Sequence, residues 1–157
     1  MSNILIEPLV NHPDTVPRLA EISYQLIGSI WVPGSSIDTN INKLNEHLNI
    51  DNLPITFVAL IDSQPVGMSS LRANDGIRPD LTPWLGSLVV EPNYQNQGIG
   101  RKLIEVTKNK AKELSFQRLC LFAFDPTVPK YYSRLGWHEI AKDEFMGSSI
   151  TVMECQL

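Results

Sequence analysis

The chain has few cysteines and no long apolar run. Only two of its 157 residues are cysteines, Cys120 and Cys155, and both lie in strand-like runs, so we expect buried free thiols rather than a disulfide or a metal pair. The longest compact apolar run, residues 55–61, has the length of a strand, whereas a membrane helix needs about 20 residues. The first residues also lack the charged start and apolar core of a secretion signal. We therefore expect a cytoplasmic protein that does not associate with membranes.

Positive charge is scarce as well. Lys and Arg number 13 against 17 Asp and Glu, which gives a formal net charge of -4 and argues against general nucleic-acid binding. This balance favours a cationic partner, but only through a weak long-range field. The one basic cluster lies on a predicted helix and is either a solvated face or, at its N-terminal end, a contact for a phosphorylated ligand. Its members are Arg101, Lys102, Lys108, Lys110 and Lys112.

Apolar periodicity and Pro/Gly breaks predict alternating strands and helices. A short strand at residues 4–6 precedes two helices, and the loop at residues 31–38 between those helices is a common place for substrate contacts. The predicted helices are residues 14–30, 37–48, 98–114 and 128–135, and the remaining strands are residues 55–61, 66–72, 84–90, 118–124, 137–141 and 150–156. The second and third strands form a hairpin, and the strand pair around helix 98–114 is parallel. We expect one domain over residues 1–157.

The most informative segment, residues 88–103, runs from an apolar strand through a polar turn into a basic helix. Gly98 and Gly100 allow a diphosphate to approach the unpaired amides of the first helical turn, whose dipole favours negative charge. A P-loop needs a different glycine spacing, and a Rossmann fingerprint needs a third glycine where Leu103 stands. The alternative is an ordinary connection between a strand and a helix.

Two motifs resemble the GNAT superfamily of acyl-coenzyme A dependent N-acetyltransferases. Residues 95–100, Gln-Asn-Gln-Gly-Ile-Gly, fit the family turn [Arg/Gln]-x-x-Gly-x-[Gly/Ala] and follow the usual Val-x-Pro at residues 90–92. Residues 132–137, Tyr-Ser-Arg-Leu-Gly-Trp, fit the segment Tyr-x-x-x-Gly-aromatic. The resemblance covers essentially the whole chain and implies an α/β (α+β) fold. Its central sheet would be mixed and mostly antiparallel, with about six to seven strands and about four flanking helices.

The same resemblance implies acetyl-coenzyme A as co-substrate and no metal. The pantetheine arm would lie between the fourth and fifth strands, and the diphosphate on the turn. The implied cofactor-binding residues are Leu88, Val89, Val90, Gln95, Asn96, Gln97, Gly98, Ile99, Gly100 and Arg101. Asn96 stands where the family often has glycine, and the asparagine that often precedes the last helix is missing from residues 125–129.

For the chemistry, the resemblance implies that Tyr132 protonates the departing thiolate as general acid and that a backbone N–H of Val89 or Val90 polarises the thioester carbonyl. The general base is Asp80, Asp75 or Glu91 acting through water, and of these we select Asp80. His47 and His138 have no partner at metal or triad spacing, and we do not expect them to be catalytic.

These features lead to an N-acetyltransferase that acts by direct attack of a primary amine of a small molecule, such as a polyamine, an amino acid or an aminoglycoside-like compound. The alternatives are an acetyltransferase for protein N-termini or lysines, and a catalytically silent module that binds acetyl-coenzyme A. A protein acceptor needs an open groove, so a pocket closed beneath the loop at Trp31 would count against it. The resemblance also implies a homodimer whose contacts involve the last strands.

Overall fold

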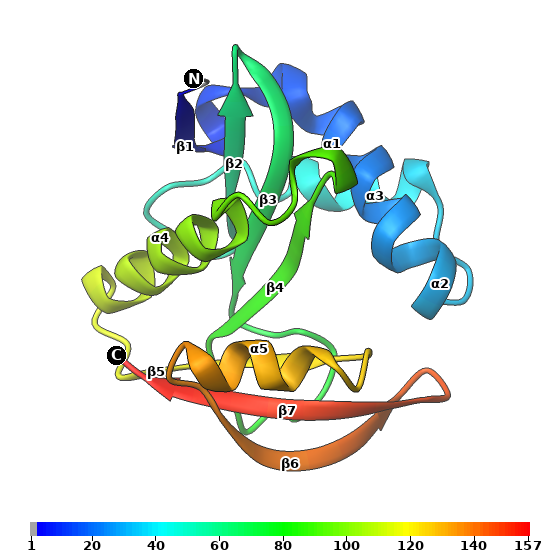
Figure 1. Ribbon diagram of the computed structural model, residues 1–157, viewed down its shortest axis with the longest axis vertical. Helices are drawn as coiled ribbons and strands as arrows, with labels where there is room; N and C mark the ends of the chain where they lie inside the picture. Colours follow the sequence, from blue (N-terminus) through cyan, green and yellow to red (C-terminus); the bar gives the residue numbers. More distant parts are fainter. Residues whose placement is uncertain (1–2) are drawn as a thin grey trace.

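A seven-stranded sheet forms the centre of the computed structural model, which describes residues 3–157 (Figure 1). The strand order is β1-β2-β3-β4-β5-β7-β6, and only β4 and β5 are parallel. The strands are β1 (Ile4–Pro8), β2 (Ile55–Ile61), β3 (Gln64–Arg72), β4 (Trp84–Val90), β5 (Arg118–Ala123), β6 (His138–Phe145) and β7 (Ser148–Gln156). The α-helices are α1 (Val16–Ser23), α2 (Ser29–Trp31), α3 (Ile37–Asn45), α4 (Ile99–Glu113) and α5 (Val128–Arg134). The predicted mixed, mostly antiparallel sheet is thus confirmed.

Helices cover both faces of the sheet, and β2 is buried along its whole length. Because successive strand side chains point to opposite faces, Val58 and Leu60 pack in one core cluster with α1 and α3, while Phe57 and Ala59 pack in another with α4. This double coverage explains why the strand is a continuous apolar run rather than an alternating one. No helix among residues 3–157 has the length and apolar character to cross a membrane.

The first predicted helix differs from the expectation of one regular element. A π-helical segment, Tyr24–Gly28, separates α1 from α2. The absence of a side chain at Gly28 lets the following loop pack closely, because a Cβ atom at this position would collide with the Ser35 hydroxyl. Helical periodicity in the sequence cannot reveal this extra residue in one turn, and such segments are frequent at functional sites.

The sheet divides between β4 and β5. These two strands pair only at Trp84 and Cys120, after which they diverge (Figure 1). A β-bulge in β4 accompanies the divergence, because the pairing with β3 jumps from Gly86 to Val89, and Ser87 has a positive φ of 51°. The fold therefore presents two half-sheets with an unpaired edge of β4 between them.

Candidate active site

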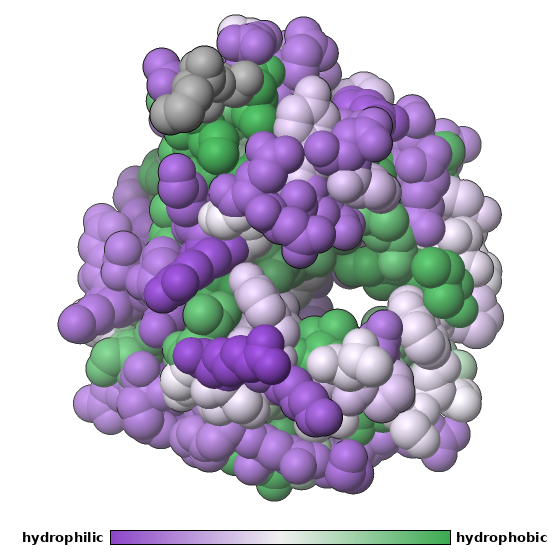
Figure 2. Space-filling view, in the orientation of Figure 1, coloured by the Kyte–Doolittle hydropathy of each residue, from purple (hydrophilic) through white to green (hydrophobic). Residues whose placement is uncertain are grey.

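An opening lies between the half that contains β1–β4 with α1–α3 and the half that contains β5–β7 with α5 (Figure 2). The unpaired edge of β4 faces this divergence. The Glu91 N–H donates to the Val66 carbonyl of β3, and a Cβ at Gly67 would lie 2.7 Å from the Val89 carbonyl oxygen, so the backbone of Val89 is turned toward β3. By the alternation of an antiparallel ladder, the backbone groups of Leu88 and Val90 face the cleft. Two of the three predicted strand contacts therefore face it, and Val89 does not.

The predicted phosphate turn connects this strand edge to α4. Asn96 and Gly98 have positive φ values of 63° and 84°, so the turn uses the left-handed backbone region that Asn and Gly tolerate best. The Gln95 side-chain amide donates to the Val90 carbonyl at 2.9 Å and ties the turn to β4. Ile99 is 1% exposed and anchors the start of the helix in the core.

The amides of this turn are available to a ligand. Among the described residues, the backbone N–H groups of residues 96–101 have no hydrogen-bond partner, whereas the Gln95 N–H donates to the Pro92 carbonyl. Gly98 caps α4 without a side-chain hydrogen bond. Six consecutive free amides at the start of a 15-residue helix, next to the Arg101 side chain, suit a diphosphate.

Tyr131, which no sequence motif singles out, borders this turn. A Cβ atom at Gly100 would lie 3.8 Å from the Val90 side chain and 3.9 Å from the Tyr131 hydroxyl oxygen. The exposed Tyr131 of α5 therefore reaches across from the other half of the molecule. The sequence alone does not predict that Tyr131 and Tyr132 both lie near the cleft, because neighbouring positions on a helix normally face different directions.

Tyr132 is buried at the base of α5, at 6% exposure. Its ring makes edge contacts with Tyr131 and Trp137, and it shares a hydrophobic cluster with Leu88 of β4. Burial, with a smaller contribution from Tyr131, raises the pKa of Tyr132 above its usual value, so the phenol is protonated at neutral pH. The structure thus presents a neutral, desolvated phenol whose hydrophobic cluster includes Leu88 of β4.

A cavity of about 100 Å³ lies where α1, the π-helical segment and α3 pack near the bulge of β4. It is lined by Ser23, Ile27, Gly28, Val32, Ser35, Asn40, Lys43, Leu44, Met68, Arg72 and Ser87. At one end of the cleft, the rings of Trp31 and Phe124 stack with centroids 5.4 Å apart and planes 4° apart. Trp31 ends α2 and Phe124 follows β5, so the stack joins the two halves of the molecule.

Comparison with known proteins agrees with this geometry. The family model "Acetyltransferase (GNAT) family" matches residues 21–137, from α1 to the aromatic residue after α5. The chain belongs to the GNAT acetyltransferase family. Its members transfer acetyl groups from acetyl-coenzyme A, so the protein is an acyltransferase with acetyl-coenzyme A as co-substrate.

Solved structures share the GNAT fold at low sequence identity. The protein yncA from Salmonella typhimurium, solved with its cofactor acetyl-coenzyme A, has a TM-score of 0.77 at 17% identity, over 99% of this chain and 95% of that one. An acetyltransferase from Streptococcus agalactiae has a TM-score of 0.73 at 21% identity, over 98% of both chains. N-acetylglutamate synthase from Neisseria gonorrhoeae, complexed with coenzyme A and N-acetyl-glutamate, has a TM-score of 0.75 at 16% identity, over 100% of this chain and 36% of that one. No curated protein sequence matches the chain.

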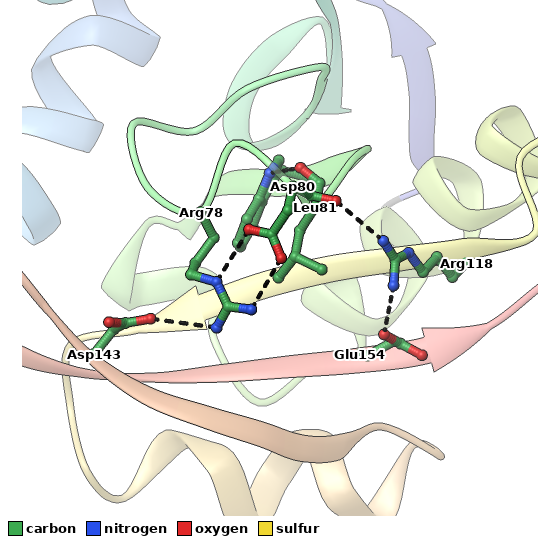
Figure 3. A network of polar contacts seen from close by, with 7 residues as sticks. Arg78, Asp80, Leu81, Arg118, Asp143 and Glu154 are labelled. Atoms are coloured by element: carbon green, nitrogen blue, oxygen red, sulfur yellow. Dashed lines mark hydrogen bonds and ion pairs between the residues drawn. The ribbon is translucent and has the colours of Figure 1, made fainter.

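The selected base, Asp80, lies away from the strand divergence of this GNAT fold. Its carboxylate accepts two hydrogen bonds from Arg78, at 3.1 and 3.0 Å, and its backbone carbonyl accepts from Arg118 near the start of β5 (Figure 3). The Asp80 side chain is 61% exposed, and the hydrogen bonds from Arg78 lower its pKa. The other two candidates also pair with arginine, Asp75 with Arg72 at 2.8 Å and Glu91 with Arg18 at 3.6 Å. Only Asp75 adjoins the bulge, since a Cβ at Gly86 would lie 3.2 Å from its carboxylate.

A buried polar network centred on Arg72 was not anticipated. Its guanidinium donates to His47 Nε2 at 3.0 Å, to Asp75 at 2.8 Å and to the Ser87 hydroxyl. His47 Nε2 accepts that bond, so the neutral ring carries its proton on Nδ1 and donates to the Lys43 carbonyl at 2.7 Å. One sequence feature could have indicated this network: Arg72 ends an apolar strand, and a buried arginine needs hydrogen-bond or charged partners.

The buried His47 predicts how stability depends on pH. Desolvation, with the neighbouring Arg72 charge, lowers the pKa of His47 from 6.5 to about 4. Between these values the unfolded chain binds a proton that the folded chain excludes, so stability falls as the pH is lowered from about 6.5 to about 4. The loss at this residue is about 3 kcal/mol. We expect His47→Gln to flatten urea-derived stability over this range, whereas the exposed His138→Gln should leave the slope unchanged; equal slopes in all three proteins would contradict the account.

The two cysteines are buried, as expected, and are poor nucleophiles. Desolvation raises the pKa of Cys120, and it raises the pKa of Cys155 to about 11. Thiols of this kind carry little thiolate at neutral pH and are unsuited to form an acetyl-enzyme intermediate. Among the described residues there is also no group of three or more metal-ligating side chains.

Proposed function

We propose that this GNAT enzyme transfers the acetyl group directly from acetyl-coenzyme A to a primary amine of a small molecule. The stack of Trp31 on Phe124 is the observation that carries the choice of acceptor, because it joins the two halves of the molecule and would restrict the access of a peptide at that end of the cleft. The cavity lined by Arg72 and Ser87 has a volume of about 100 Å³, which suits an acceptor of few atoms.

The donor would bind along the β4 edge. The backbone groups of Leu88 and Val90 would bond the pantetheine amides, as a strand partner does, and the amides of residues 96–101 would hold the diphosphate. Gln95 would support the diphosphate site indirectly, because its side-chain amide donates to the Val90 carbonyl and fixes the turn to β4. The acetyl-coenzyme A and coenzyme A complexes of the structural neighbours support this assignment.

The reaction would proceed by attack of the neutral amine on the thioester carbon. A C–N bond forms, the C–S bond breaks, and a backbone N–H at the β4 edge, from Leu88 or Val90, stabilises the oxyanion. Tyr132 gives its proton to the departing thiolate. The amine proton leaves through water to a carboxylate, and Asp75 beside the bulge is better placed for this role than Asp80. Direct transfer is also supported by the buried, protonated thiols.

Trp31→Ala tests the closure of the cleft. We expect the unmodified enzyme to release thiol from acetyl-coenzyme A with small amines and not with peptides. Loss of the stacked ring should lower the preference for small amines over peptides, as the ratio of kcat/KM values, about tenfold or more. Ile30→Ala is the matched control, because the neighbouring Ile30 is 61% exposed and should leave the ratio unchanged.

The outcomes separate the candidate functions. Faster turnover of peptides than of amines by the unmodified enzyme would support a protein acetyltransferase. Binding of the coenzyme without thiol release to any acceptor would support a silent binding module.

A further inference from the structure

The cavity behind β4 contains positive charge with no carboxylate among its lining residues. Two of these residues, Lys43 and Arg72, are cationic, and Ser23, Ser35, Asn40 and Ser87 add neutral polar groups. The remaining wall is aliphatic, from the π-helical segment, α3 and β3. A protein with a net charge of -4 thus presents a locally positive acceptor pocket, the opposite of what the overall charge suggests.

Arg72 is built into this site rather than left on the surface. Its side chain is 8% exposed, and the fold keeps space for it, since a Cβ at Gly86 would collide with its guanidinium. Bonds to His47, Asp75 and Ser87 fix the plane of the group. A guanidinium has five N–H donors, so two N–H groups are left for a ligand.

Of the two cations that line the cavity, only Arg72 has an ion-pair partner among the described residues. Asp75 forms its ion pair with Arg72 at 2.8 Å and not with Lys43. Among the described residues, Lys43 makes no ion pair and no side-chain hydrogen bond, and it is exposed at the rim of the cavity. Desolvation and the Arg72 charge lower the pKa of Lys43, and the charges of Asp75 and Glu46 oppose this shift in part. A bound carboxylate would give Lys43 an ion-pair partner.

The cavity adjoins the reacting point, because Ser87 lines it and directly precedes Leu88. We propose that the acceptor is a small amino acid with an aliphatic side chain, whose carboxylate is bound between Arg72 and Lys43 while its amine faces the thioester. The inference rests on the proposed function and names the substrate class of the same site. Arg72 and Lys43 then determine specificity, and the aliphatic wall limits the size of the side chain.

Matched acceptors test the proposal. L-alanine and L-methionine are compared with their carboxamides and with putrescine, first by thiol release and then by calorimetric titration into the coenzyme A-saturated enzyme. Amidation removes only the carboxylate, so a preference for the acid reports recognition of that group. We expect kcat/KM for the acids to exceed that for the amides at least about tenfold, and putrescine to be a poor acceptor.

Lys43→Met is the diagnostic variant, because Lys43 is exposed and its loss leaves the Arg72 network intact. Lys43→Met should reduce the preference for acid over amide about tenfold, mainly by raising KM for the acid. Lys142→Met is the matched control, because Lys142 lies on β6 and is 76% exposed, and it should leave this preference unchanged. Equal or better use of the amides or of putrescine would overturn the proposal, as would a preference unaffected by Lys43→Met. Acid-selective binding without thiol release would instead overturn the proposed function alone, and failure of the acids to bind or react would overturn the carboxylate assignment.

Discussion

Tyr132→Phe is expected to lower kcat by about 10²- to 10⁴-fold, the range typical of a lost general acid. The Tyr132 phenol is buried in a cluster that includes Leu88, and its raised pKa keeps it protonated. Phe keeps the ring contacts with Tyr131 and Trp137 but removes the hydroxyl proton of residue 132. The Kd of coenzyme A and the thermal midpoint should change little. Stopped-flow measurement of thiol release at saturating acetyl-coenzyme A gives kcat directly.

Tyr131→Phe is the comparison that isolates this role. It removes the same hydroxyl from the adjacent residue, whose oxygen lies near Gly100 at the phosphate turn. We expect a higher KM for acetyl-coenzyme A and a nearly unchanged kcat. The reverse pattern, with kcat lost in Tyr131→Phe and kept in Tyr132→Phe, would move the proton donor to Tyr131.

Gly100→Leu is expected to weaken coenzyme A binding about 30-fold or more. A Cβ at Gly100 meets Val90 and Tyr131 at ordinary contact distances, 3.8 and 3.9 Å, so a methyl group fits but the rest of a leucine side chain would occupy the space in front of the free amides. Backbone amides cannot be replaced by a side chain elsewhere, so the lost contacts have no substitute.

Gly100→Ala provides the control for steric blocking. It should bind coenzyme A within about threefold of the unmodified enzyme and be more stable by about 0.5–1 kcal/mol, because glycine is costly in a helix. Isothermal titration with coenzyme A and urea unfolding measure both quantities. Equal affinity in the alanine and leucine variants would mean that the diphosphate does not lie on this turn.

Local sequence signals were sufficient for most of the fold. The apolar run at residues 55–61, the turn before Val66 and the helix that follows Gly98 each depend on neighbouring residues, and the sheet contains the corresponding elements. The free amides before α4 also follow from local signals, namely the glycine positions and the start of a helix, while the binding of a diphosphate there stays a prediction.

Features that depend on tertiary contacts were not predicted. The bulge at Ser87 and the orientation of Val89 arise from the register with β3, which the sequence of β4 alone does not specify. The network of Arg72 with His47 joins side chains 25 positions apart, and their pairing becomes clear only when α3 packs beside β3. Asp80 was selected for its place in the loop before β4, and the fold pairs its carboxylate with Arg78 and its carbonyl with Arg118.

The most direct measurement of the whole account is a competition in a single reaction. Equal concentrations of a small aliphatic amino acid and an unblocked peptide are mixed with the enzyme and acetyl-coenzyme A, and mass spectrometry locates the acetyl group while thiol release is followed. The account predicts that acetyl amino acid accumulates in the same amount as free thiol, with no acetyl group on the protein or the peptide. Acetylated peptide as the main product, or an acetylated enzyme that forms without acceptor, would contradict direct transfer to a small amine.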